Sequence, residues 1–198
     1  MHLKASNLAI ERGGRVVLSD IGFEVADGEL LVVLGPNGSG KTSLLRLIAG
    51  LIEAVSGTIE LTGGSADHGI GEQAHYVGHQ DGLKPALTVA ENLAFWAGFL
   101  GGGEIECSVG AFGLADLRAL PAGVLSAGQR RRLALSRLLL TRRALWLLDE
   151  PTSGLDASSS AKLCEHMRGH LADGGIIVAA THAELDIAAS RRLELGAT

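Results

Sequence analysis

The sequence is poor in cysteine and in aromatic residues, and it has no long hydrophobic run. Cys107 and Cys164 form no C-x-x-C pair, which argues against a disulfide framework and favours reduced thiols. The longest stretch without a charged residue, 92–103, is well short of the roughly 20 apolar residues that a membrane-spanning helix needs. We therefore expect that the chain does not cross a bilayer by itself. Residues 1–4 (MHLK) lack the apolar core of a secretory signal, which favours a cytoplasmic location.

Positive charge is also in short supply, because the formal net charge is −5 at pH 7. That balance argues against a broad nucleic-acid-binding surface, so no nucleic-acid partner is expected. The densest basic group, Arg130 to Arg132 with Arg137, is interpreted as a solvated helix face, with a site for an anionic partner as the alternative. The 198 residues and the 46% hydrophobic content fit one domain over 1–198.

Two kinds of apolar pattern divide the chain. Short apolar runs between glycine turns predict strands, whereas apolar residues at helical spacing predict helices. The predicted strands are 3–10, 16–25, 30–34, 57–61, 75–78, 145–148 and 176–180. The predicted helices are 41–50, 88–100, 104–112, 126–140 and 157–171. Because a helix joins the almost wholly apolar strand 145–148 to 176–180, these two strands are expected to be parallel.

Helices dominate one internal part of the chain and strands the rest. The expected fold class is α/β: a parallel sheet core with an N-terminal antiparallel β subdomain and an inserted helical subdomain. The core and the β subdomain are assigned to about 1–82 and 144–198, and the helical subdomain to about 83–143.

The most informative motif is G-x-x-x-x-G-K-T at Gly35–Thr42, directly after the apolar run 30–34. A strand, a glycine loop and a helix start in this order form a phosphate cradle, in which backbone N–H groups and the helix dipole face the anion. Lys41 is expected to reach the outer phosphates, and the Thr42 hydroxyl to hold Mg²⁺. A glycine-rich turn that binds nothing is the alternative, which the flanking strand and helix disfavour.

Two acids follow the apolar run 145–148. Asp149 and Glu150 are expected at the carboxyl end of a strand, where open α/β sheets bind ligands. Asp149 would orient Mg²⁺ through its water shell, and Glu150 would polarise the water that attacks the γ-phosphate. A solvated strand end is the alternative. Because no asparagine precedes a lysine, the Asn-Lys-x-Asp motif that reads guanine is missing from the sequence, and ATP is favoured over GTP.

A third motif lies between the phosphate loop and the two acids. Leu125-Ser126-Ala127-Gly128-Gln129 resembles the signature loop of the ABC-type ATPases, and Ser126 would cap a helix whose N–H groups form a second anion clamp. Gln80 resembles the family's Q-loop glutamine, 153–156 (SGLD) its D-loop, and His182 its switch histidine. The resemblance implies a P-loop NTPase fold with a RecA-like core, in which ATP and Mg²⁺ are bound and ATP is hydrolysed.

The resemblance also implies a role for each matched residue. The implied catalytic residues are Glu150, His182 and Lys41, and the implied Mg²⁺ ligands are Thr42, Gln80 and Asp149. ATP would be bound within one copy by Arg12, Gly35, Pro36, Asn37, Gly38, Ser39, Gly40, Lys41, Thr42 and Ser43, and from a second copy by Ser126, Gly128, Gln129 and Asp156. The implied working state is a head-to-tail dimer with two ATP molecules between the copies.

Two positions depart from the family pattern. Ala127 replaces the first glycine of the usual signature pair, which leaves Gly128 for close approach of the backbone. Arg12 stands where many relatives have an aromatic residue that stacks on adenine. The guanidinium plane could stack instead, or the base could be held loosely. Adenine recognition is therefore the least defined part of the expected site.

Whole phrases of the sequence, 76–93 and 125–132, look like those of the ATP-binding subunits of haem exporters in cytochrome c maturation. The resemblance implies a peripheral subunit on the cytoplasmic face of the inner membrane, docked on integral permease subunits and driving haem transfer or release of a haem carrier. A soluble, non-transport ABC ATPase that acts as a nucleotide-gated switch is the alternative. A non-catalytic nucleotide-binding scaffold is a second one, against which Glu150 and His182 argue.

Three of the few aromatic residues, Phe95, Trp96 and Phe99, lie close together on one predicted helix. They either form an exposed surface for a partner or are buried in the helical subdomain's own core.

Overall fold

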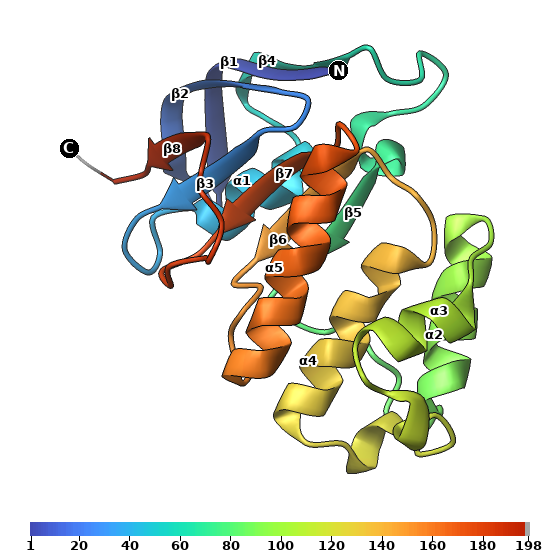
Figure 1. The fold of residues 1–198 in the computed structure, drawn as a ribbon. Coiled ribbons are helices and arrows are strands. Elements are labelled where there is room, and N and C mark those ends of the chain that lie inside the picture. Colours follow the sequence, from blue (N-terminus) through green and yellow to red (C-terminus); the bar gives the residue numbers. More distant parts are fainter. Residues whose placement is uncertain (197–198) are drawn as a thin grey trace. The chain divides into compact units, whose positions relative to one another are not determined.

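The computed structural model describes residues 1–196, which form two compact units (Figure 1). Unit 1 comprises Met1–Gly78, Arg143–Pro151 and the described residues from Met167 onward. Unit 2 comprises His79–Arg142 and Thr152–His166. The segment after the two acids therefore groups with the helical insertion in space, although the sequence places it next to a core strand.

Unit 1 is built on two sheets (Figure 1). The antiparallel sheet has the strand order β2-β1-β4 and is formed by β1 (His2–Arg12), β2 (Arg15–Ala26) and β4 (Ser56–Thr62). The parallel sheet has the order β5-β6-β7-β3-β8 and is formed by β3 (Leu30–Leu34), β5 (Ala74–Val77), β6 (Leu145–Asp149), β7 (Ile176–Ala180) and β8 (Arg191–Glu194). The expected parallel pairing of β6 with β7 is confirmed, with Leu145 opposite Ile176.

The core of unit 1 lies around the parallel sheet. Every residue of β6 and β7 is buried, as expected for central strands that are covered on both faces. Helix α1 (Lys41–Ile48) follows β3 and contacts β6 and β7. Its buried face carries Leu44 and Leu45, so the apolar stripe predicted for this helix packs on the sheet.

Strand β8 has no counterpart among the strands predicted from the sequence. Its sequence, RRLE, has no apolar run, and three of its four residues are exposed. Residues 191–194 become a strand because they pair with 31–34 of β3 at the edge of the sheet. Charged side chains are well suited to an edge strand, since they discourage pairing with further chains.

Unit 2 is helical and contains α2 (Val89–Leu100), α3 (Ile105–Ala111), α4 (Ala127–Ser136) and the first part of α5 (Ala157–Ala172). Short 3₁₀ turns are found at η1 (Ile70–Gln73) in unit 1 and at η2 (Ala115–Leu117), η3 (Ala122–Val124) and η4 (Arg137–Leu139) in unit 2. Helix α2 begins at a capping box in which Thr88 and Glu91 bond each other's backbone N–H groups, and it ends at Gly101, whose φ is 92°.

The predicted helix 126–140 is shorter in the structure. Helix α4 ends at Ser136, and the chain tightens into the 3₁₀ turn η4. The Ser136 hydroxyl donates to the carbonyl oxygen of Leu133 at 2.8 Å, a local bond that competes with the regular helix pattern. The predicted α/β class with an antiparallel β part and a helical insertion is confirmed. Among residues 1–196, each helix is too short or too polar to span a membrane.

Candidate nucleotide-binding site

The loop Gly35–Thr42 joins β3 to α1, and its glycines allow a close turn. Gly35 has φ 146°, and a Cβ there would lie 2.5 Å from the Leu195 carbonyl oxygen and 2.6 Å from Ser39 Oγ. Gly40 has φ 97° and forms the N-cap of α1, and a Cβ there would lie 2.8 Å from the Leu18 side chain. Both positions therefore require glycine, because space and backbone conformation exclude a side chain. The segments around Leu18 and Leu195 therefore pack closely against the loop, at Gly40 and Gly35 respectively.

Lys41 lies inside this loop and is only 7% exposed. Its ammonium donates to the carbonyl oxygens of Gly35 at 2.7 Å and Pro36 at 3.1 Å. Ser39 Oγ is buried, and within residues 1–196 it has no hydrogen-bond partner. A buried hydroxyl without a partner and a buried ammonium that its own loop bonds only through neutral carbonyl oxygens both suit an anion. The loop thus fits a phosphate group.

Thr42 and Asp149 bring two hard oxygen atoms together. Thr42 Oγ1 donates to Asp149 Oδ2 at 2.8 Å, and Asp149 ends β6 with 2% exposure. Hydroxyl and carboxylate oxygens are ligands that Mg²⁺ prefers, and in nucleotide sites Mg²⁺ takes its other ligands from phosphate and water. No cluster of three or more histidine, cysteine, aspartate or glutamate side chains in residues 1–196 would hold a metal by itself. The pair therefore fits Mg²⁺ that arrives with a nucleotide.

Glu150 is the first residue after β6 and has a left-handed backbone with φ 46°. Its N–H donates to the Ala180 carbonyl oxygen of β7 at 2.8 Å, which holds this conformation in place. A non-glycine residue in this region costs on the order of 1–3 kcal/mol, and such strain is found most often at functional sites. The side chain accepts a bond from the His182 N–H at 3.4 Å.

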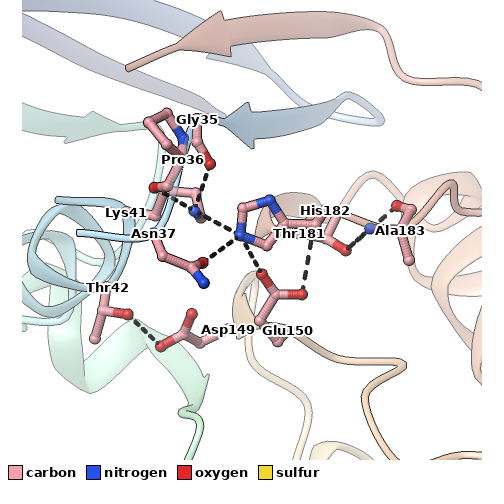
Figure 2. A network of polar contacts seen from close by, with 10 residues as sticks. All are labelled: Gly35, Pro36, Asn37, Lys41, Thr42, Asp149, Glu150, Thr181, His182 and Ala183. Carbon is pink, nitrogen blue, oxygen red and sulfur yellow. Dashed lines mark hydrogen bonds and ion pairs between the residues drawn. The ribbon is translucent and has the colours of Figure 1, made fainter. Parts of the chain in front are cut away.

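His182 completes the network in Figure 2, just beyond the end of β7. Its Nε2 lies 2.9 Å from Asn37 Oδ1, 3.0 Å from Lys41 Nζ and 3.5 Å from Glu150 Oε1. The neighbouring Thr181 is 1% exposed, and its hydroxyl accepts from the Ala183 N–H at 3.0 Å, which shapes the turn that carries the histidine. The structure thus brings together Lys41, Glu150 and His182, which the sequence analysis assigned to catalysis.

Comparison with known proteins decides the family. The family model described as ABC transporter matches residues 18–153, most of the chain. The chain belongs to the ABC transporter family. The resemblance stated from the sequence motifs is therefore confirmed, and the chain is an ATP-binding ATPase of this family.

Relatives of known name match over their whole length. A "Cytochrome c biogenesis ATP-binding export protein CcmA" from Rhodopseudomonas palustris (strain BisB5) is 54% identical over 100% of this chain and 99% of the relative. Proteins of the same name from Nitrobacter winogradskyi and from a Chelativorans species are 54% and 48% identical, over 99% and 100% of this chain and 98% and 99% of the relatives.

Solved structures agree with the fold. A "Putative ABC transporter (ATP-binding protein)" from Pyrococcus furiosus superposes with a TM-score of 0.83 at 24% identity, covering 98% of each chain. The "Structure of ATP binding subunit of ABC transporter" gives a TM-score of 0.81 at 27% identity, over 92% of this chain and 80% of the other. The predicted P-loop NTPase fold is confirmed.

The motif 125–129, which resembles the ABC signature loop, lies in unit 2. Ser126 is the N-cap of α4: its hydroxyl accepts from the Gln129 N–H at 3.2 Å, and its own N–H donates to Gln129 Oε1 at 2.8 Å. This capping box orients both side chains, while the hydroxyl hydrogen of Ser126 can still donate to a ligand. A Cβ at Gly128 would lie 3.0 Å from the Gly154 carbonyl oxygen. The absence of a side chain at Gly128 therefore allows the backbone of segment 153–156, in the same unit, to come close to the start of α4.

The other ABC positions of unit 2 are exposed. Gln80 and Asp156 both lie at the surface of the part of the chain that the structure describes. Asp156 caps the start of α5, because its Oδ1 accepts from the Ser159 N–H at 2.7 Å and from the Ser158 hydroxyl at 2.9 Å. The bond from the Ser159 N–H, helped by that from Ser158, lowers the pKa of Asp156 below its usual range. Asp156 thus serves as a helix cap within unit 2.

The β1–β2 hairpin contributes a contact that the sequence analysis missed. Arg12 is exposed at the end of β1 opposite Arg15, whereas Leu18 and Val17 of β2 press on Gly40. In the sequence, only Gly40 itself indicated that another segment comes close to the loop. Nothing in residues 16–18 indicates a contact of Leu18 with a residue 22 positions away. Of the remaining loop residues, Gly38 is exposed with φ 85° and Ser43 is buried on α1.

Proposed function

We propose that the chain is the ATP-hydrolysing subunit of an export complex for cytochrome c biogenesis, and that it drives haem transfer or the release of a loaded haem carrier. The observation that carries the proposal is the 54% identity over full length with relatives of that name. The network of Figure 2 supports the catalytic part, because it holds a lysine, a glutamate and a histidine around one phosphate loop.

The chemistry follows from the atoms of this network. Lys41 exchanges its two loop carbonyls for phosphate oxygens when a nucleotide enters the loop. Glu150 accepts the proton of the attacking water, and His182 donates to the γ-phosphate. Thr42 and Asp149 would hold Mg²⁺, which would supply charge neutralisation at the phosphates.

A second copy is the proposed partner at the γ-phosphate. Ser126, Gly128, Gln129 and Asp156 all belong to unit 2, where the capped start of α4 directs N–H groups outward from an exposed loop. A helix start of this kind binds anions. We infer that units 1 and 2 together form one ATPase domain, and that two such domains close head to tail on two ATP molecules.

The docking surface for the membrane partner is proposed on α2. Phe95 and Phe99 are 45% and 74% exposed, and Trp96 packs edge-on between them with ring centroids 5.9 and 5.7 Å away. The Arg137 guanidinium lies over the face of the Trp96 ring, 4.4 Å from the ring centroid, and this cation–π contact fixes the cluster of Phe95, Trp96 and Phe99. Exposed aromatic side chains in a rigid cluster typify partner contacts. The proposed partner is an integral permease subunit at the cytoplasmic face of the inner membrane.

Affinity purification of the tagged chain from membranes of its native cells tests this assignment. Co-purification of integral membrane subunits is expected, whereas ribosomes or DNA in their place would favour a soluble ABC switch. Replacing Phe95 and Phe99 by serine should abolish that co-purification and leave ATP binding within about twofold, because both side chains are already exposed. Val55→Ser is the matched control, since Val55 is 60% exposed in unit 1. Retention of the membrane subunits by the double variant would refute the docking surface.

A second experiment separates the two transport roles. In cells that carry only ATPase-dead protein, haem passage across the membrane and release of the loaded carrier are measured side by side. Loss of passage supports haem transfer, and loss of release alone supports carrier release.

A further inference from the structure

Three side chains compete for one ring nitrogen of His182 (Figure 2). Its Nε2 is within hydrogen-bond distance of Asn37 Oδ1, at 2.9 Å, and of Lys41 Nζ, at 3.0 Å, while Glu150 Oε1 is farther away at 3.5 Å. Asn37 and Lys41 come from the phosphate loop and the start of α1, whereas His182 follows β7. The ring is therefore held by parts of unit 1 that are remote in sequence.

These contacts make opposite demands on the ring nitrogen. A single nitrogen of a neutral imidazole either carries a hydrogen and donates, or carries a lone pair and accepts. The Lys41 ammonium only donates, so it needs a lone pair on Nε2. The oxygen atoms of Asn37 and Glu150 only accept, so they need a hydrogen on Nε2. The bond from Lys41 and the bond to Asn37 thus exclude each other in any one form of the ring.

The groups around Nε2 favour the protonated nitrogen. Lys41 already donates two of its three hydrogens to the carbonyl oxygens of Gly35 and Pro36, so the ammonium keeps most of its bonds without the histidine. Asn37 provides the shortest of the three contacts, and the Glu150 carboxylate adds a second, more distant acceptor. Without the Asn37 oxygen, the closest remaining group at Nε2 is the ammonium, which favours the opposite form.

We propose that Asn37 is a positioning residue: it holds His182 with the hydrogen on Nε2 before any nucleotide binds. A phosphate oxygen only accepts hydrogen bonds, so this is the neutral form in which Nε2 can donate to the γ-phosphate. Asn37 in this role acts through His182 and does not itself need to touch the nucleotide. The inference rests on the proposed role of His182 in ATP hydrolysis.

The first test is made on the nucleotide-free, full-length protein. Long-range ¹H–¹⁵N NMR distinguishes the two neutral forms of a histidine, and the His182 signals are assigned by their loss in His182→Ala. The wild type is expected to carry the hydrogen on Nε2. Asn37→Leu, which keeps the size and removes the oxygen, should shift His182 towards the form with hydrogen on Nδ1. Asn37→Asp, which keeps an acceptor oxygen, should preserve the wild-type form. An unchanged form in Asn37→Leu would overturn the proposal.

The second test is a double-mutant cycle on steady-state ATP hydrolysis. Asn37→Leu should lower kcat about 10-fold, the effect of one lost hydrogen bond, with KM within about threefold. In a His182→Ala background the same substitution should change kcat less than about twofold, since its target is gone. An equal loss in both backgrounds would show that Asn37 acts independently, against the proposal. If the wild type hydrolyses no ATP, the proposed function fails, while the NMR result still decides the role of Asn37.

Discussion

Replacement of Glu150 by glutamine is the sharpest single test of the catalytic network. Glutamine keeps the size of the side chain and a carbonyl oxygen that can accept from the His182 N–H, now bonded at 3.4 Å. It also keeps the backbone bond from residue 150 to the Ala180 carbonyl oxygen. The substitution therefore removes the basicity of the side chain and, because an amide has a single oxygen, the 3.5 Å contact of the other carboxylate oxygen with His182 Nε2.

The expected loss follows from the role of a general base. Such a group contributes about 10²–10⁴-fold to the rate, which corresponds to roughly 2.7–5.4 kcal/mol of transition-state stabilisation. ATP affinity should stay within about threefold, because Lys41 and the phosphate loop are untouched. The melting temperature should also be unchanged within a few degrees, since both side chains fit the same left-handed backbone at φ 46°.

The assay is phosphate release at saturating ATP, with binding of a fluorescent ATP analogue measured on the same preparation. Glu165→Gln is the matched control, because Glu165 is an exposed glutamate on α5 in unit 2 and should retain full activity. ATP hydrolysis near the wild-type rate in Glu150→Gln would refute the assignment of Glu150 as the base.

Two further predictions concern pairs in unit 1. Thr42→Val removes the hydroxyl that donates to the 2% exposed Asp149, so the free energy of unfolding should fall by about 1–3 kcal/mol, and Mg²⁺ should no longer strengthen ATP binding. Thr42→Ser keeps the hydroxyl and should behave like the wild type in urea unfolding and in ATP titrations with and without Mg²⁺. If Mg²⁺ changed ATP binding equally in Thr42→Val and Thr42→Ser, the role of Thr42 in holding Mg²⁺ would be contradicted. Bonds from Arg191, then from the Ala26 N–H, hold the pKa of Glu29 below its usual range. The ionised Glu29 side chain therefore stabilises the fold above the usual carboxyl pKa. This stabilisation is lost as the pH falls through the lowered folded-state pKa. The free energy of unfolding of Glu29→Gln should therefore be up to about 1 kcal/mol lower than that of the wild type at neutral pH. In urea unfolding this difference should shrink below about pH 4, whereas a difference that stays constant with pH would contradict a stabilising Glu29–Arg191 pair.

Much of the site was predictable because its motifs are local. The loop Gly35–Thr42 follows a buried strand and opens a helix within a few residues, so its phosphate-binding shape depends on neighbours in sequence. Likewise, the run 145–148 predicts a buried strand, and Asp149 and Glu150 must then lie at its carboxyl end. The order of the remaining motifs was enough to indicate the ABC family.

Other features could not be predicted, because they depend on packing between distant segments. The close approach of Leu195 to Gly35 joins residues about 160 positions apart in the chain. The left-handed backbone of Glu150 depends on a bond to Ala180, and nothing in its own side chain favours that conformation. The aromatic cluster of α2 had two equal interpretations from the sequence, and the exposure of Phe95 and Phe99 supports the partner surface.

The sequence by itself determined that this protein has a phosphate loop, two acids at a strand end and the motif order of an ABC ATPase, since each is a pattern of adjacent residues with local physical consequences. Only the tertiary structure decided that the charged segment Arg191–Glu194 becomes a strand, by pairing with β3. It also decided that Asn37, Lys41 and Glu150 meet at His182, more than 30 residues away along the chain. Such meetings follow from the parallel pairing of β3, β6 and β7, which places the carboxyl ends of these strands together, and no short stretch of sequence encodes them.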